Sequence, residues 1–307
     1  MRVPVRAGRM GEIAVAVWRL ARPAIWLVSI LPFLIGYVLA SSRPAPRFDR
    51  VGDLLTAIAV VGPLSWAAAL LLNDVHDTES DRRNPRRAGS PLLRGRVTAK
   101  TALAAALACA AIAVSLALTV GVAFAAIVAT FLLLCWAYSA PPLRLKEHPG
   151  ADVAVNVLGV GVLMPAAGWA LVHPLRELPP ALLIQSALIG VGLYVPSTIV
   201  DLEADRAAGY RTVAVVLGRD RAYRLGWGAW LASNAVAVVL CLNGIVVPRS
   251  LLPLLIVALP LMAFQYHGMI GRARTQPQLI RGLVTVSVTF LLANVGLMLR
   301  LSGAWPE

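Results

Sequence analysis

Nine long apolar segments constrain the fold of this chain more than any other feature. Each is about 17–22 residues long, enough for a helix to cross a hydrocarbon core about 30 Å thick. Hydrophobic residues make up 59% of the 307 residues, whereas soluble domains are about 45–50% apolar. The predicted spanning helices are 24–40, 53–72, 101–119, 121–139, 152–172, 181–200, 225–245, 250–270 and 282–300. The sequence therefore predicts an all-α, polytopic membrane protein of about nine transmembrane helices, forming a single domain over residues 1–307.

The third and fourth segments, 101–119 and 121–139, are separated only by the region of Gly121. A continuous helix of about 38 residues would be roughly twice as long as one crossing requires. We therefore predict a tight hairpin between two separate helices.

The basic residues divide unequally between the two sets of connections that nine helices create. One set carries 22 of the 28 Lys and Arg residues and the other carries 6. The six are Arg43, Arg47, Arg50, Arg176, Arg249 and Arg300. Because Lys and Arg near the ends of spanning helices stay on the cytoplasmic side, we place the basic segment 1–22 and the connections 73–100, 140–151 and 201–224 in the cytoplasm. The C-terminus then lies outside, and the cell inner membrane is the expected location.

The charge and the cysteines exclude several classes of protein. The net charge is +13, but no basic stretch outside the apolar runs is interleaved with aromatic residues, so nucleic-acid binding is not indicated. Cys109, Cys135 and Cys241 each lie in an apolar run without CxxC or Cys/His spacing. We interpret all three as buried structural thiols.

Seven of the 15 acidic residues fall in two short clusters, within residues 73–81 and 201–205, each directly after an apolar segment. If each helix continues through its cluster, polar side chains recur every three or four residues and share one stripe. The side chains on these stripes are Asn73, Asp74, Asp77 and Asp81 in the first cluster and Asp201 and Asp205 in the second.

Carboxylates this close to hydrocarbon repel one another and are costly unless a cation lies among them. An all-oxygen ligand set suits Mg²⁺, which completes its octahedron with waters and phosphate oxygens. We therefore predict that these six side chains hold Mg²⁺ and, through it, a phosphorylated substrate. The alternative is a solvated rim in which the acids pair with the basic residues between Arg82 and Lys100. Two spaced clusters, each followed by arginines that can bind phosphate bidentately, favour the metal site.

The same residues carry a family resemblance. Residues 73–81 resemble the NDxxDxxxD motif of the UbiA superfamily of intramembrane prenyltransferases, and residues 201–209 resemble its second motif, DxxxD with a trailing glycine. The connection 138–146, YSAPPLRLK, is similar to the family's third signature, YSxPPxRxK. The likeness runs from Arg22 to Gly218, roughly two thirds of the chain.

The resemblance implies a helical bundle around a central cavity, in which the aspartates hold Mg²⁺ and the ions hold the diphosphate of an isoprenoid donor. The implied activity is transfer of an isoprenyl group from an isoprenyl diphosphate to a lipophilic acceptor through an allylic carbocation. We expect that acceptor to be an aromatic ring.

The resemblance also suggests roles for individual residues. The catalytic residues that it implies are Asp77, Asp201 and Tyr138. The ring or hydroxyl of Tyr138 would lie beside the diphosphate and the cation. The expected substrate-binding residues are Asn73, Arg22, Arg82, Arg83, Ser139, Arg144, Lys146, Tyr194 and Thr198. Tyr194 and Thr198 occupy positions where other members carry an acidic residue, so neither a hydroxybenzoate nor a chlorophyllide acceptor is carried over.

Two alternatives stay open. A UbiA-type terpene cyclase would let the donor's own double bonds attack the cation, and the missing accessory acids favour it. A transporter or structural membrane protein would use the acids to conduct or bind cations without chemistry. The acids gather at one membrane face and no inverted repeat is visible, which disfavours a carrier. The sequence leaves open the prenyl chain length, the oligomeric state and the pathway.

Overall fold

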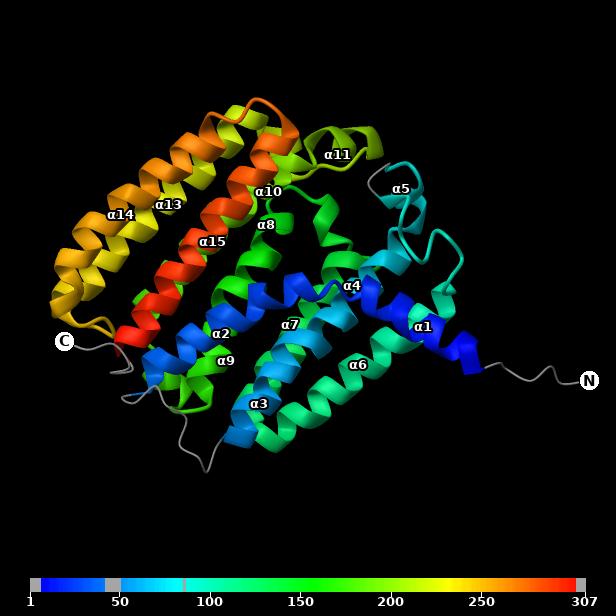
Figure 1. The fold of residues 1–307 in the computed structure, drawn as a ribbon, viewed down its shortest axis with the longest axis horizontal. Helices are drawn as coiled ribbons and strands as arrows, with labels where there is room; N and C mark the ends of the chain where they lie inside the picture. Colours follow the sequence, from blue (N-terminus) through cyan, green and yellow to red (C-terminus); the bar gives the residue numbers. More distant parts are fainter. Residues whose placement is uncertain (1–6, 42–50, 85–86, 302–307) are drawn as a thin grey trace, which may run out of the picture. The chain divides into compact units, whose positions relative to one another are not determined.

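The computed structural model describes residues 7–41, 51–84 and 87–301, and every regular element in these ranges is a helix (Figure 1). Nine of these helices are long and apolar enough to cross a membrane: Pro23–Ala40, Val51–His76, Ala99–Val120, Val122–Ser139, Ala151–Ala170, Pro180–Val200, Arg219–Asn243, Arg249–Gly271 and Gln276–Leu299. The all-α class and the nine helices are confirmed for this part of the chain, and the observed helices mostly extend the predicted segments by a few polar residues. Arg43, Arg47 and Arg50, residues 1–6 of the N-terminal segment and residues 85–86 lie outside the described residues.

The chain divides into two compact units. The first comprises Met1–Ile30 and Arg50–Arg144, and the second comprises Leu31–Asp49 and Leu145–Glu307. That residues 1–307 act as a single domain stays a prediction.

The first unit is built from helices that meet through small residues. Its elements are α1 (Ala7–Leu20), η1 (Pro23–Trp26), the start of α2 (Leu27–Ala40), α3 (Val51–Ala59), η3 (Val60–Leu64), α4 (Ser65–His76), α5 (Thr78–Arg82), α6 (Ala99–Val120) and α7 (Val122–Ser139). α4 packs against both α6 and α7. The buried face of α6 consists of alanines, including Ala102, Ala106, Ala113 and Ala117. Such small residues let helix backbones approach closely, so that van der Waals packing holds the helices together. Only Gly121 separates α6 from α7, so the predicted hairpin is confirmed.

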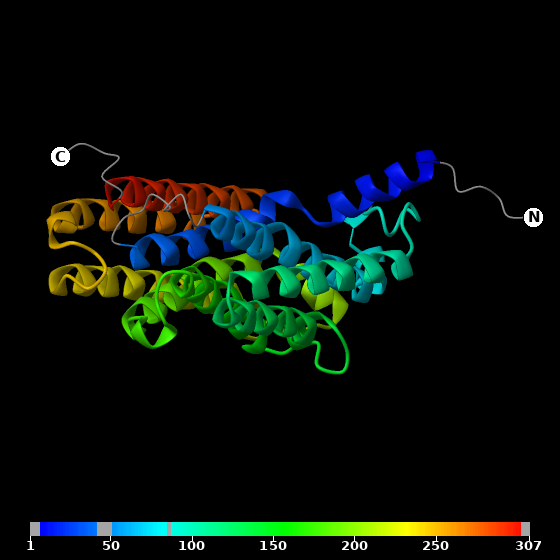
Figure 2. The same ribbon diagram turned by 90° about the horizontal axis from the view of Figure 1, so that it is seen from below.

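The second unit contains the rest of α2 and the helices after the third signature. Its other elements are η5 (Leu145–Glu147), α8 (Ala151–Asn156), η6 (Val157–Leu163), α9 (Met164–Ala170), η7 (Leu175–Glu177), α10 (Pro180–Val200), α11 (Leu202–Ala208), α12 (Val213–Leu217), α13 (Arg219–Asn243), η8 (Arg249–Leu251), α14 (Leu252–Tyr266), η9 (His267–Gly271) and α15 (Gln276–Leu301). α10 packs along α13, and α13, α14 and α15 run side by side (Figures 1 and 2). Trp230 of α13 stacks on Tyr266 of α14 at a centroid distance of 5.1 Å. The Tyr266 hydroxyl donates to the carbonyl of Gly192 on α10 at 2.7 Å, which joins the three helices.

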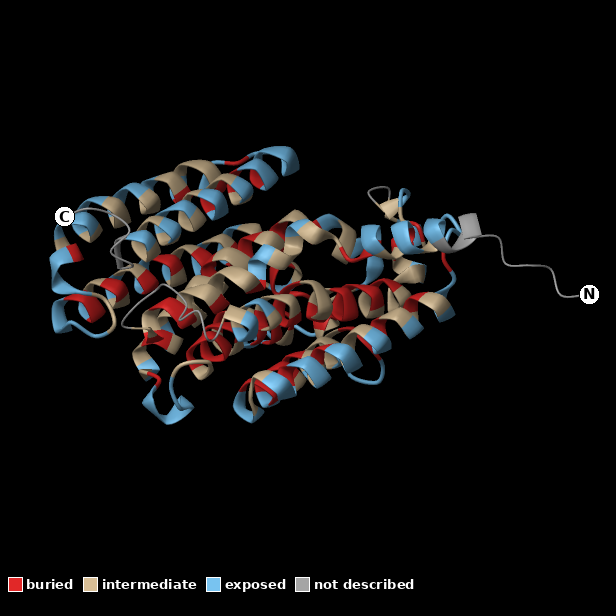
Figure 3. Cartoon of the chain, turned by 60° about the horizontal axis from the view of Figure 1, so that its bottom comes forward, coloured by how far each residue is buried: buried red, intermediate tan, exposed pale blue. Residues whose placement is uncertain are grey.

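Large apolar side chains are exposed along the spanning helices. On α14 these include Leu254, Val257, Leu261 and Phe264, the last 72% exposed. Figure 3 shows exposed positions along many of the helices. An apolar surface of this extent would be an aggregation hazard in water, whereas hydrocarbon is its natural solvent. Together with the nine apolar helices, this surface makes the chain a multi-pass membrane protein.

In the second unit, α9 crosses the second half of α2 at a distance that only glycine permits. A Cβ at Gly168 would lie 1.9 Å from the carbonyl oxygen of Phe33 and 2.6 Å from the backbone nitrogen of Tyr37. Both contacts are with backbone, which cannot rotate away as a side chain would. The position is therefore a close-packing contact of the small-residue type found between membrane helices.

We predict that Gly168→Ala destabilises the fold by about 1–3 kcal/mol, because the added methyl group forces α9 and α2 apart. Gly228 of α13 is the matched control, since a Cβ there meets nothing within 4 Å. Gly228→Ala should leave the thermal unfolding midpoint in detergent unchanged or slightly raised. Equal midpoints for the two variants would contradict the close approach of α9 and α2.

Candidate functional site

The first aspartate motif, residues 73–81, lies where α4 gives way to α5. The backbone of Asp77 (φ −97°, ψ 3°) interrupts the helix between the two elements. The N–H of Asp77 still donates to the carbonyl of Asn73 at 2.9 Å, and that of Asp81 donates to the carbonyl of Asp77 at 2.8 Å. The four-residue spacing that a continuous helix would give is thus kept, although the helix is interrupted at Asp77. The Thr78 hydroxyl donates to the carbonyl of Val75 at 3.0 Å and so competes with the helical ladder there.

The third signature contributes two side chains to this motif. The Ser139 hydroxyl, at the buried end of α7, donates to Oδ1 of Asn73 at 3.0 Å. The Asn73 amide in turn donates to Oδ2 of Asp77 at 2.9 Å. Arg144 lies 3.5 Å from Oδ1 of Asp77 and donates to the carbonyl of His76 at 3.2 Å. The structure therefore brings four predicted site residues into one network, with half-buried Tyr138 next to Ser139 in sequence.

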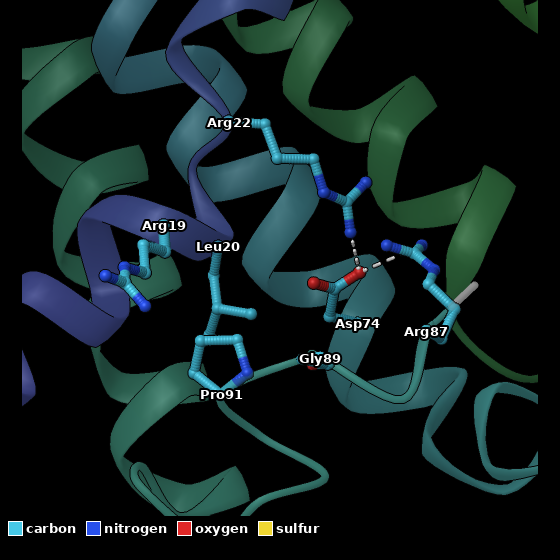
Figure 4. Close-up of a pocket in the computed structure, with 8 residues that line it drawn as sticks. Arg19, Leu20, Arg22, Asp74, Arg87, Gly89 and Pro91 are labelled. Atoms are coloured by element: carbon cyan, nitrogen blue, oxygen red, sulfur yellow. Dashed lines mark hydrogen bonds and ion pairs between the residues drawn. The ribbon is translucent and has the colours of Figure 1, made fainter. Parts of the chain in front are cut away.

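Asp74 is the most deeply buried acid of the first motif, with 2% of its surface exposed. Its Oδ1 atom pairs with Arg22 and lies 3.4 Å from Arg87 (Figure 4). Its Oδ2 atom is buried and has no hydrogen-bond partner. A buried carboxylate oxygen without a donor is energetically costly, so this atom is available to a cation or a protonated ligand.

Asp81 lies outside the membrane-spanning segment, and burial is the main cause of its raised pKa. Burial raises its pKa above the ordinary value, Arg87 opposes that effect, and the Asp74 and Asp77 carboxylates raise the pKa further. Arg87 pairs with it, with Nε at 3.3 Å from Oδ1, and the charge of Arg22 also lowers its pKa. A divalent cation near these three carboxylates would relieve the repulsion among them, which contributes to the raised pKa.

A pocket of about 210 Å³ opens beside Asp74, entirely within the first unit (Figure 4). Three arginines line it, Arg19, Arg22 and Arg87, together with Ser90. Figure 4 shows the guanidinium groups of Arg22 and Arg87 pointing toward the single carboxylate of Asp74. The two guanidinium groups of Arg22 and Arg87 against the one carboxylate of Asp74 give this pocket an excess of positive charge, which suits a phosphate group.

The arginines of the first motif do not have the arrangement that the sequence suggests. Arg82 and Arg83 are exposed and pair with Glu79 at 3.5 and 3.3 Å, so their predicted role in substrate binding stays a prediction. Arg87, which sequence reasoning missed, lies instead between Asp74 and Asp81. Residues 82–87 contain four arginines, and no local sequence pattern shows which of them pairs with the aspartates of the motif.

The second motif repeats the local geometry of the first. The backbone of Asp201 (φ −96°, ψ 0°) interrupts the helix between α10 and α11, and the N–H of Asp205 donates to the carbonyl of Asp201 at 2.8 Å. α11 ends at Gly209, whose φ of +78° favours glycine. The chain then turns back, and the Thr212 hydroxyl donates to Oδ2 of Asp205 at 3.1 Å. The trailing glycine of the motif thus brings a hydroxyl onto its second aspartate.

The remaining predicted residues lie in the second unit. Lys146 of η5 is buried, with 7% of its surface exposed. Thr198 is buried on α10, and its hydroxyl donates to the carbonyl of Val195 at 2.7 Å. Tyr194 is half-buried on the same helix, and its carbonyl accepts from Ser197. The roles of these residues in substrate binding stay predictions.

The donors of the two motifs are oxygen atoms of carboxylates and of one side-chain amide. Among the residues that the structure describes, no three His, Cys, Asp or Glu side chains form a group able to hold a metal. The chemistry nevertheless fits magnesium: the donors are oxygens, the buried Oδ2 of Asp74 lacks a partner, and the first motif combines three carboxylates. The same donor set is unsuited to a soft metal, because it contains neither cysteine nor histidine ligands.

The chain is thus a helical membrane protein with an aspartate motif at an interrupted helix in each of its two units. Residues 29–295 match the UbiA prenyltransferase family, and the chain belongs to that family and is a prenyltransferase. It is 32% identical over 266 residues to a lycopene elongase/hydratase of Halobacterium salinarum, covering 83% of this chain and 88% of that protein. A lycopene elongase/hydratase of Haloferax volcanii is 33% identical over 241 residues, covering 76% and 75% of the two chains. The fold is similar to that of a UbiA homolog from Archaeoglobus fulgidus solved with DMAPP and Mg²⁺ bound, with a TM-score of 0.74, 21% identity and coverage of 94% and 99%.

Arg87 and Arg83 provide a test of the local electrostatics. Arg87→Gln should lower the free energy of unfolding by about 1–3 kcal/mol, because it removes the cation that lies between two buried carboxylates. Arg83→Gln, which breaks only an exposed pair with Glu79, should change it by less than about 1 kcal/mol. The measurement is the thermal unfolding midpoint of the purified protein in detergent without Mg²⁺. Equal midpoints would show that Arg87 does not stabilise the motif.

Proposed function

We propose that this chain is a Mg²⁺-dependent prenyltransferase that takes an isoprenyl group from an isoprenyl diphosphate. The observation that carries the proposal is the pair of aspartate motifs, each at an interruption between two helices, in a chain of the UbiA family. The ligands proposed for magnesium are Asn73, Asp74, Asp77, Asp81, Asp201 and Asp205. The A. fulgidus homolog, solved with DMAPP and Mg²⁺, supports this choice of donor class and metal.

The protein's residues would act mainly on the leaving group. Breaking the allylic C–O bond leaves its electron pair on the diphosphate and a positive charge on the allylic carbon. When bound, Mg²⁺ would neutralise the charge that develops on the diphosphate. The arginines of the pocket beside Asp74 would hold the diphosphate oxygens, and Arg144 would keep Asp77 oriented. The buried Lys146 keeps its predicted role in substrate binding. The ring of Tyr138 would face the allylic cation.

For the acceptor, we propose a linear polyene hydrocarbon of the lycopene type in place of the aromatic ring that the sequence led us to expect. The two relatives named above are lycopene elongase/hydratases. A second argument comes from α10, which carries no acidic residue over Pro180–Val200. A phenolic acceptor benefits from a carboxylate base that removes its proton, whereas an alkene attacks a cation without losing one first. The Thr198 hydroxyl, already donating to the carbonyl of Val195, is no substitute for such a base.

The proposed transfer balances with water as the third reactant. The π electrons of the acceptor's terminal double bond form a C–C bond to the allylic carbon, and the positive charge passes to the more substituted acceptor carbon. Water adds to that carbon and loses a proton, which yields a tertiary alcohol and free diphosphate. The overall change is elongation with hydration, as in the names of the two relatives.

We also propose an orientation in the membrane. The excess of Lys and Arg in one set of connections places the N-terminus and the segments 73–100, 140–151 and 201–224 in the cytoplasm, in the inner membrane of the cell. Water-soluble isoprenyl diphosphate would then reach the aspartate motifs from the cytoplasm.

Substituting one ligand in each motif tests the metal-dependent chemistry. Asp77→Asn and Asp201→Asn should each lower Mg²⁺-dependent diphosphate release by about a hundredfold or more. Glu79→Gln and Glu203→Gln are matched controls, because these acids belong to the same motifs but are 73% and 85% exposed. The assay measures diphosphate released from dimethylallyl diphosphate by the purified protein with acceptor. Release that survives both aspartate substitutions would refute the proposed site.

Mass spectrometry of the products tests the acceptor. With lycopene, dimethylallyl diphosphate and ¹⁸O-labelled water, we expect a product one prenyl unit longer that carries one labelled oxygen. With 4-hydroxybenzoate in place of lycopene, we expect no prenylated product. Prenylated 4-hydroxybenzoate would restore the aromatic acceptor, and a hydrocarbon formed from the donor alone would identify a terpene cyclase.

A further inference from the structure

Asp152 is a buried carboxylate that none of the three family signatures includes. It lies in the first turn of α8, with 1% of its surface exposed. Both of its carboxylate oxygens are hydrogen-bonded to backbone: Oδ1 accepts from the N–H of Gly150 and Oδ2 from the N–H of Val213, each at 2.9 Å. The first bond is local, but the second spans 61 residues and fixes the segment that follows the second motif.

The residue next to Val213 connects this carboxylate to the motif. Thr212 is buried, and its hydroxyl donates to Oδ2 of Asp205 at 3.1 Å. Asp152 therefore holds the backbone at Val213, the backbone places Thr212, and Thr212 fixes one oxygen of Asp205.

A second bond in the same region joins the same two segments. The N–H of Arg211 donates to the carbonyl of Glu147 at 3.2 Å. Glu147 closes the short helix η5, which also carries the buried Lys146. The segment 211–213 is thus attached at two points to residues 147–152, and Lys146 and Asp205 belong to one connected framework.

The chemistry requires a carboxylate at position 152. Two N–H groups from different segments need two acceptor atoms, and an ionised carboxylate supplies both with charge-assisted bonds. An asparagine of the same shape would keep one acceptor and place its NH₂ group against the other N–H. Asp152→Asn therefore removes one of the two bonds with almost no change in volume.

We propose that Asp152 is a positioning residue of the prenyl-transfer site, acting through Val213 and Thr212 to orient Asp205 toward the metal. This inference rests on the proposed function, in which Asp205 is a magnesium ligand. Partners that orient a metal-binding carboxylate commonly affect metal affinity by about 10–100-fold when they are lost. The expected signature of a positioning role is thus weaker metal binding in a protein that is still folded.

The first experiment compares Asp152→Asn with Asp220→Asn in the full-length protein. Asp220 is the matched control, because it is the acidic residue in the first turn of α13 and is exposed. Titration with Mn²⁺, followed by electron paramagnetic resonance in the presence of dimethylallyl diphosphate, should give an apparent dissociation constant about tenfold higher for Asp152→Asn and unchanged for Asp220→Asn. The Mg²⁺ concentration for half-maximal diphosphate release should rise by the same factor, with the rate at saturating Mg²⁺ largely kept.

Hydrogen exchange supplies a readout that needs no metal. In Asp152→Ala, which removes both acceptors, backbone amides of residues 211–214 should exchange about tenfold faster than in the wild type, because Val213 loses its acceptor. Asp220→Asn should leave them unchanged. Unchanged exchange in Asp152→Ala, or unchanged Mn²⁺ affinity in a folded Asp152→Asn protein, overturns the proposal.

Thr212 allows a test that does not depend on folding of the Asp152 variant. Thr212→Val removes the hydroxyl at nearly constant volume and should weaken Mn²⁺ binding, whereas Thr212→Ser keeps the hydroxyl and should restore it. Equal Mn²⁺ affinities for the two variants overturn the proposal. A wild-type protein that neither binds Mn²⁺ nor releases diphosphate would refute the proposed function itself, whereas normal wild-type behaviour with insensitive variants refutes only the role of Asp152.

Discussion

The structure of this chain depends on how the negative charge of carboxylates at the ends of apolar helices is balanced by positively charged partners. Asp74 lies on α4, the last part of a 26-residue span, and is almost fully buried. A carboxylate there is tolerated only with a partner of opposite charge, and Arg22 and Arg87 supply it through a single oxygen. The other oxygen of Asp74 has no hydrogen-bond partner, and burial together with the neighbouring carboxylates raises the pKa of Asp81. An unpartnered carboxylate oxygen beside two further carboxylates is a physical reason for a cation to bind.

The two aspartate motifs share the same local backbone geometry. A regular helix would continue the apolar span past its aspartate, whereas the backbones of Asp77 and Asp201 adopt nearly equal non-helical angles and start a short second helix. The bond between residues four apart survives at both places, so each pair of aspartates remains on one side of its segment. The surroundings differ: the first motif is held by arginines and by Asn73, the second by the hydroxyl of Thr212.

Much of the fold could be predicted from the sequence, because membrane spans depend on length and apolarity, which are local properties. The hairpin at Gly121 followed from the limit on helix length alone. In the site, the network of Asn73, Asp77, Ser139 and Arg144 was found through motif spacing, although its function stays untested. Sequence reasoning failed where a partner is chosen by three-dimensional packing. In the sequence, nothing distinguishes Arg87 from Arg82 and Arg83. In the structure, Arg87 pairs with the buried Asp74, whereas Arg82 pairs with the exposed Glu79.

Asp152 is a second residue whose partner could not be predicted from the sequence. In the sequence it is one acid at the start of an apolar segment, where a first-turn aspartate is common because it favours the helix dipole. Its long-range bond to Val213 depends on the folding back of the chain after Gly209, which no local pattern reveals. The sequence does contain one indication: a charged residue within an apolar span needs a partner, and no Lys or Arg lies within four residues of Asp152.

The distribution of acids also bears on which acceptors this prenyltransferase accepts. In the described part of the second unit, α10 leads to Asp201 through a run of apolar and hydroxyl side chains, with Pro196 and Thr198 buried just before the motif. Such a surface provides neither a base nor a charged partner for a polar acceptor, but it is compatible with a hydrocarbon. An apolar acceptor lacks groups for hydrogen bonding, so its selection must depend on shape and on the position of its double bond relative to the allylic carbon. The aspartate motifs would then determine where the cation forms, and the apolar helices would determine which double bond reaches it.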